Sequence, residues 1–110
     1  MKLNVSERLL LLFMCVNWEK RYLPNLTSKK VMFDFGNDLG FTQEEIDKLE
    51  FNKNVTDWNK KEDKAKEIKV GNRVQEIIQN ELRGLERKGK LNFIKHFSLC
   101  EKFGYVPQER

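Results

Sequence analysis

A helix start at Thr42, directly after Gly40, constrains the fold of this chain more than any other sequence feature. Thr42 and Glu45 have the spacing of a capping box, and Phe41 and Ile46 flank it at the spacing of a hydrophobic staple. Apolar residues at helical spacing precede the glycine: Val31, Met32, Phe35 and Leu39. The pattern predicts two helices joined by a short glycine turn, which is a helix-turn-helix.

This helix-turn-helix has the small and apolar residues that a DNA-binding helix-turn-helix requires, but the charges of its second helix are unsuited to binding DNA. Gly36 supplies a small residue where the helices would cross, and Gly40 supplies the turn. Residues 42–50 carry four acidic side chains and one basic side chain, so the second helix would be repelled by phosphates. We therefore expect this segment to be a tri-helical packing unit, and the alternatives are DNA binding through the second helix and protein recognition by its exposed acidic face. The side chains of that face are Gln43, Glu44, Asp47 and Lys48.

Three further helices are predicted outside the helix-turn-helix, and the first of them completes the tri-helical unit. Ser6 is expected to cap a first helix that contains the apolar run Leu9–Val16, and Asn72 a fourth helix that ends at Gly89. The fourth helix has an apolar stripe: Val74, Ile77, Ile78, Leu82 and Leu85. A fifth helix is expected at about 92–103, with an inward face of Phe93, Phe97, Cys100 and Phe103.

Between the third and fourth helices the helical period disappears. Residues 55–58 and 66–70 have strand-like composition and predict a β-hairpin, with a disordered charged loop as the alternative. The predicted fold class is therefore mainly α, with about five helices, a tri-helical helix-turn-helix-like N-terminal unit and one β-hairpin. A chain of 110 residues is expected to form a single domain over residues 1–110.

The residue types needed for catalysis or metal binding are sparse, and we expect neither an enzyme nor a cofactor. His96 is the only histidine, and acidic residues are expected on solvated helix faces. Cys15 and Cys100 fall at apolar helix positions, which is typical of buried thiols in a cytoplasmic protein, although a bridge between them stays open. The eight-residue apolar run Leu9–Val16 is too short for a membrane span of about 20 residues.

Basic side chains are concentrated in the second half of the chain. Residues 1–59 carry eight basic and nine acidic side chains, whereas residues 60–110 carry thirteen and eight. One basic group lies on the expected hairpin and another near the turn between the last two helices, and both are candidates for phosphate binding. The two groups consist of Lys60, Lys61 and Lys64, and of Arg87, Lys88 and Lys90. The alternative interpretation is that the lysines of the hairpin lie on a solvated strand edge, where their charges prevent aggregation.

Several segments resemble small proteins encoded by phages and prophages of Lys/Asn-rich genomes. They are residues 1–12 (MKLNVSERLLLL), residues 39–46 (LGFTQEEI), the Asp57-Trp58-Asn59 loop and residues 89–91 (GKL) before the last helix. The resemblance implies a phage-borne accessory protein, either a modulator of a host factor in the host-cell cytoplasm or a small virion component. It transfers no functional residue to any position of this chain.

The function expected from the sequence is a non-enzymatic protein–protein interaction module. The alternative is a winged-helix-like DNA-binding protein that contacts phosphates through the basic hairpin and the turn between the fourth and fifth helices.

Overall fold

Five α-helices dominate the structure. The computed structural model describes residues 1–21 and 26–107, except for the side chains of residues 15–21, 26–29 and 93. The helices are α1 (Val5–Arg21), α2 (Leu26–Leu39), α3 (Gln43–Leu49), α4 (Asn72–Arg87) and α5 (Phe93–Phe103). The other elements of the described residues are a 3-10 helix, η1 (Lys60–Glu62), and two short strands, β1 (Lys2–Leu3) and β2 (Lys66–Glu67). The predicted fold class, mainly α with one small antiparallel β element, is confirmed.

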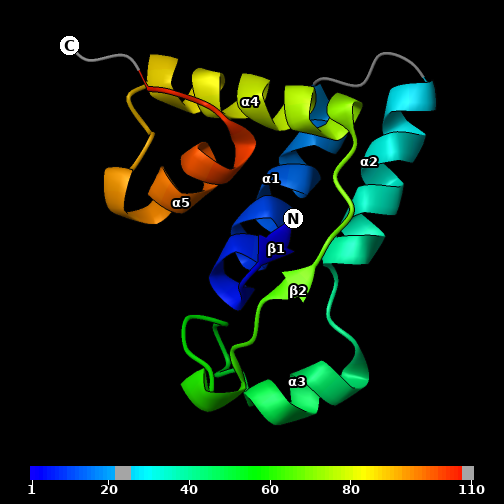
Figure 1. Cartoon of the computed structure of the whole chain (residues 1–110), viewed down its shortest axis with the longest axis vertical. Helices are drawn as coiled ribbons and strands as arrows, with labels where there is room; N and C mark the ends of the chain where they lie inside the picture. Colours follow the sequence, from blue (N-terminus) through cyan, green and yellow to red (C-terminus); the bar gives the residue numbers. More distant parts are fainter. Residues whose placement is uncertain (22–25, 108–110) are drawn as a thin grey trace.

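The helices are arranged as a larger body and a smaller lobe (Figure 1). In the body, α2 packs along α1, α4 crosses above both, and α5 folds back below α4. α3 lies away from these four helices, at the end of the molecule opposite α4, and contacts η1. We call residues 41–64, which contain α3 and η1, the α3 lobe.

The hydrophobic core lies between the helices of the body. Each helix contributes residues at helical spacing, and the apolar stripe expected on α4 is confirmed. The buried core residues of the helices are Leu11, Met14, Met32, Phe35, Leu39, Val74, Ile78, Leu82, Leu99, Cys100 and Phe103. Burial of this apolar surface is the main force that holds the body together.

The inward face of α5 differs from the expected one by one step around the helix. Cys100 and Phe103 are buried as predicted, but Phe97 is 46% exposed, so its predicted inward orientation is wrong. The buried residues His96, Leu99, Cys100 and Phe103 follow the spacing i, i+3, i+4, i+7, and Phe97 therefore falls on the neighbouring face. Cys100 is a buried free thiol, and the side chains of Phe93 and Cys15 lie outside the described side chains.

The two-stranded β element pairs segments that are far apart in the sequence. Lys2 lies opposite Glu67 and Leu3 opposite Lys66, in antiparallel register. The expected partner of this strand, residues 55–58, is not a strand, and that part of the hairpin prediction is wrong. Ile68, next to β2, and Leu3 are both buried in the core, so the pairing places apolar side chains from both segments inside the body.

Helix caps explain where the helices begin. The capping box of Thr42 and Glu45 is confirmed at α3, because each side chain accepts a hydrogen bond from the other residue's backbone N–H. α1 begins before Ser6, since Asn4 and Glu7 form the same reciprocal pair of hydrogen bonds (2.9 and 2.8 Å). α4 also begins one residue earlier than expected, and Gly71 occupies its N-cap.

The turn between α2 and α3 depends on Gly40 but not on Gly36. A Cβ atom at Gly40 would lie 3.3 Å from the backbone oxygen of Asn37, which is a tight approach. A Cβ atom at Gly36 would meet no atom within 4 Å, so the expected role of Gly36 at a helix crossing is wrong. α3 is instead positioned by contacts with η1 and by a side chain of α1.

Candidate functional site

Arg8 of α1 holds the α3 lobe on the body. Its side chain is 1% exposed and donates through Nε to the carbonyl of Leu39 (3.0 Å) and through Nη2 to that of Gly40 (2.6 Å). Nη1 donates to Oε2 of Glu45 at 2.6 Å. One guanidinium therefore binds the last carbonyl of α2, the carbonyl of the turn residue after it and the capping carboxylate of α3 at the same time.

The same guanidinium lowers the pKa of Glu45 from 4.5 to about 2. The hydrogen bond from Arg8 is the largest cause, and the backbone N–H of Thr42 acts in the same direction, against the opposing effect of burial. Glu45 is thus held as a carboxylate at neutral pH, in a structural role that leaves it little freedom to bind a ligand.

A chain of aromatic rings continues from Arg8 into the lobe. The guanidinium carbon lies 3.9 Å from the centre of the Phe41 ring, and Phe41 meets Phe51 edge-to-face with ring centroids 5.4 Å apart. Phe51 meets Trp58 at 6.0 Å, and Nζ of Lys60 lies 3.6 Å from the centre of a Trp58 ring. These contacts give the lobe a small apolar core of its own, bounded by a cation at each end.

Asp63 ties the aromatic chain back to the body. Its Oδ2 accepts a hydrogen bond from the indole Nε1 of Trp58 (2.9 Å), and its Oδ1 accepts one from the backbone N–H of Val5 (3.1 Å). Trp58 is therefore fixed by a ring contact, a cation and a hydrogen bond, and its orientation does not depend on a bound ligand.

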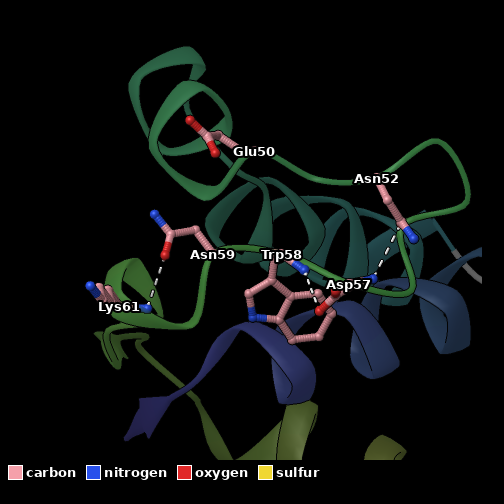
Figure 2. Close-up of a pocket in the computed structure, with 6 residues that line it drawn as sticks. All are labelled: Glu50, Asn52, Asp57, Trp58, Asn59 and Lys61. Carbon is pink, nitrogen blue, oxygen red and sulfur yellow. Dashed lines mark hydrogen bonds between the residues drawn. The ribbon is translucent and has the colours of Figure 1, made fainter.

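A shallow hollow opens beside Trp58, between the end of α3 and η1 (Figure 2). Its lining residues are Glu50, Asn52, Asp57, Trp58, Asn59 and Lys61. Oδ1 of Asn52 accepts hydrogen bonds from the backbone N–H groups of Thr56 (2.8 Å) and Asp57 (3.2 Å), which closes the intervening loop. The hollow thus presents amide and carboxylate oxygens, one ammonium group and an indole, a set suited to the polar groups of a peptide.

The loop beside the hollow contains two residues in left-handed backbone conformations. Glu50 has φ of 50° at the end of α3, and Val55 has φ of 54° within the loop. A β-branched residue such as Val55 adopts this region rarely and at a cost in free energy. The loop is a tight turn of its own, which is why residues 55–58 do not form the expected strand.

The structure brings two of the three predicted groups of site residues into one lobe. Gln43, Glu44, Asp47 and Lys48 are exposed on α3, and Lys60, Lys61 and Lys64 are exposed on the same lobe. On α3, Nε2 of Gln43 donates to Oδ1 of Asp47 (2.9 Å), and Nζ of Lys48 lies 3.2 Å from Oε1 of Glu44. The third group, Arg87, Lys88 and Lys90, is exposed at the end of α4 and in the turn after it, away from the lobe (Figure 1).

The charges of the α3 lobe are mixed, with an acidic excess. Residues 41–64 carry seven acidic and five basic side chains. The lysines at 60, 61 and 64 therefore lie among carboxylates, and Asp57 lies 3.7 Å from Nζ of Lys60. Such a surface does not form the uniformly positive track that a phosphate backbone requires.

The interior of the body contains charged residues that the sequence analysis missed. Arg8 and Glu7 are each 1% exposed and Glu81 is 7% exposed, so the expectation that acidic residues lie on solvated faces is wrong for Glu7 and Glu81. Oε1 of Glu7 accepts hydrogen bonds from the backbone N–H of Asn4 (2.9 Å) and from Nζ of Lys102 (2.7 Å). The sequence feature that indicates burial of Glu7 and Arg8 is their spacing of four and three residues from Leu11, which places them on the inward face of α1.

The described residues contain neither a candidate metal site nor a membrane-spanning helix. Within the described residues, no three His, Cys, Asp or Glu side chains come together in a way that could hold a metal ion. None of the described helices has both the length and the apolar character needed to cross a membrane. His96 is buried, and its burial lowers the pKa of the imidazole. Comparison with family models, curated proteins and solved structures finds no match.

Proposed function

We propose that this chain is a non-enzymatic protein-binding module that recognises its partner through the α3 lobe. The observation that carries the proposal is the hollow beside Trp58, in which an indole lies among the polar groups of Asp57, Asn59 and Lys61. Tryptophan is enriched among the residues that dominate protein–protein binding energies, and polar groups around it supply specificity.

The fixed geometry of the lobe supports a binding role. Trp58 is held in place by Phe51, Lys60 and Asp63, so binding a partner would not require its side chain to be ordered first. A preorganised surface loses less conformational entropy on association, and more of the contact energy is available for affinity.

The charge of the lobe favours a protein over a nucleic acid as the partner. The exposed residues of α3 include Glu44 and Asp47, and the whole lobe has more acidic than basic side chains. The resemblance to small phage and prophage proteins is the reason for proposing that the partner is a host factor, met in the cytoplasm of the host cell.

DNA binding is the second candidate function. It is favoured by the exposed Arg87, Lys88 and Lys90 at the end of α4, which lie outside the acidic lobe. The hairpin that would act as a wing does not form from residues 55–58, so any phosphate contact is proposed for the α4–α5 turn alone.

Quantitative affinity capture with matched variants tests the proposal. The double variant Glu44→Lys/Asp47→Lys reverses the charge of the α3 face, and Asp34→Lys/Asp38→Lys makes the same change in net charge on exposed positions of α2. We expect a protein that is captured by the wild type and the α2 variant, is lost with the α3 variant, and binds directly once purified.

Titrations with duplex DNA test the second candidate function, DNA binding. Micromolar affinity that weakens steeply between about 50 and about 200 mM salt, together with no protein partner that depends on α3, would overturn the proposed function in favour of DNA binding.

A further inference from the structure

A second surface lies at the junction of α4 and α5, which we call the α4–α5 corner and define as residues 83–95. It carries five basic side chains and one acidic side chain. Lys88, Lys90 and Lys95 are exposed on it, and Ile94 is 93% exposed. Exposed apolar area next to a strong charge is typical of an interaction surface rather than of an ordinary solvated turn.

The exposed face of α3 has the opposite charge and a similar apolar centre. Residues 42–50 carry four acidic side chains and one basic side chain. Ile46 is 40% exposed and lies one helical turn along α3 from Gln43. Glu45 is bound to Arg8, so the exposed charged side chains of this segment are Glu44, Asp47, Glu50 and Lys48, with a net charge of −2. This charge is opposite to the +4 of the corner, and each surface exposes an isoleucine whose burial would stabilise a contact.

The α4–α5 corner and the exposed face of α3 do not contact each other within one molecule. α3 lies at the end of the molecule opposite α4, whereas the α4–α5 corner lies at the side, beyond the body helices (Figure 1). A contact between the two must therefore be made between copies. Two copies that exchange both contacts form a closed dimer, whereas copies that use one contact each with different neighbours form chains or rings.

We infer that the α4–α5 corner binds the acidic face of α3 on a second copy of this chain. The inference rests on the proposed protein-binding role of the α3 lobe and names one partner for it. A second copy is chosen over an anionic surface of another kind because one chain carries both complementary patches. The contact is electrostatic at its rim, so it weakens as salt screens the charges.

Sedimentation measurements on the full chain, at a series of protein and salt concentrations, test the inference. We expect the mass-average mass to rise above the 13.2 kDa of the monomer as protein concentration increases at low salt, and to return to it at high salt. Two double variants each remove one patch: Glu44→Lys/Asp47→Lys on α3, and Lys88→Glu/Lys90→Glu on the corner. Each variant alone should stay monomeric at low salt.

Mixing an α3 variant with the corner variant gives the decisive result. Glu44→Gln/Asp47→Asn keeps an intact corner, and the corner variant keeps an intact α3 face, so an equimolar mixture of these two should form a one-to-one complex that grows no further. The neutral α3 variant is used for mixing because lysines at 44 and 47 would attract the reversed charges of the corner variant. Asp34→Lys/Asp38→Lys and Lys53→Glu/Lys69→Glu change net charge equally at other exposed positions, and should self-associate like the wild type. Glu44→Gln/Asp47→Asn repeats the α3 test without reversed charge, and circular dichroism checks that every variant is folded.

Three results overturn the inference. They are a wild type that stays monomeric at all concentrations, self-association that neither double variant affects, and variants that form no complex when mixed. Binding of duplex DNA that the corner variant abolishes, in a wild type that does not self-associate, assigns the corner to nucleic acid instead. If the inference fails while the α3 variant still loses a captured partner protein, the proposed function stands without it.

Discussion

Replacement of Arg8 by alanine tests the central structural role assigned to this residue. Arg8 is 1% exposed and makes hydrogen bonds of 3.0, 2.6 and 2.6 Å to Leu39, Gly40 and Glu45. Removing one partner of a buried ion pair costs about 3 to 5 kcal/mol. Glu45 is 29% exposed and can be rehydrated, so we expect a value near the lower end, about 3 kcal/mol.

Urea denaturation followed by circular dichroism measures this loss. For a chain of this size, about 3 kcal/mol corresponds to a fall in Tm of roughly 10 to 20 °C. Arg8→Lys keeps the positive charge but lacks the planar fork of donors, so it should lose about 1 to 2 kcal/mol. A loss below about 1 kcal/mol for Arg8→Ala, as is typical of an exposed ion pair, would refute the reasoning.

A double-mutant cycle with Glu45→Gln separates the ion pair from the other contacts of Arg8. If Glu45 and Arg8 act together, the two substitutions are not additive, and the second costs less once the first is present. Additive losses would show that the carbonyls of Leu39 and Gly40 account for the effect.

The same ion pair predicts how stability depends on pH. The pKa of Glu45 is about 2 in the folded chain and 4.5 in the reference state, so the folded state favours the carboxylate. The stabilisation is complete above about pH 4.5 and is lost as pH falls through the window towards about 2. Arg8→Ala should flatten the pH dependence of stability in this window, and an unchanged profile would contradict the assigned cause.

Four further substitutions test other parts of the fold by the same denaturation assay. Gly36→Ala should stabilise the protein by about 0.5 to 1 kcal/mol, because Gly36 lies within α2 with open space around it. Gly40→Ala should destabilise it, because the new Cβ would lie 3.3 Å from a backbone oxygen; equal effects at the two glycines would contradict both assignments. Val55→Gly should stabilise the protein by about 1 kcal/mol by relieving the left-handed conformation, and a loss would show that the valine side chain makes a compensating contact. Lys102→Met should cost about 3 kcal/mol by leaving the buried carboxylate of Glu7 without its ion-pair partner, and a cost near zero would show that the carboxylate is otherwise compensated.

Much of the fold followed from local patterns in the sequence. The α3 capping box and the apolar stripe of α4 were predictable because each depends on residues within a few positions of one another. The end of α2 before Gly40 was also predictable, since a tight helix-to-helix turn favours glycine. The candidate site was predictable only in part: the exposed residues of α3 and the lysines at 60, 61 and 64 were named, but not the hollow beside Trp58.

Two of the features that the sequence did not predict depend on contact between residues distant in the chain. The pairing of β1 with β2 joins Leu3 to Lys66 across more than half of the sequence, and no local pattern specifies it. The structural role of Arg8 could not be predicted, because its side chain binds carbonyls of Leu39 and Gly40 and the carboxylate of Glu45, more than 30 residues away in the sequence. Phe97 was assigned to the core by hydrophobicity, although position on the helix decided its exposure.

The sequence by itself therefore determined which segments are helical, where α3 begins, and that the charge of α3 is unsuited to phosphate. Those properties depend on neighbouring residues and on composition. Only the tertiary structure decided that α3 leaves the body to join η1, that Trp58 borders a hollow, and that the basic α4–α5 corner is separate from the lobe. Burial of apolar surface and of the Arg8 guanidinium decides these placements, because both depend on all the segments that meet in the folded chain.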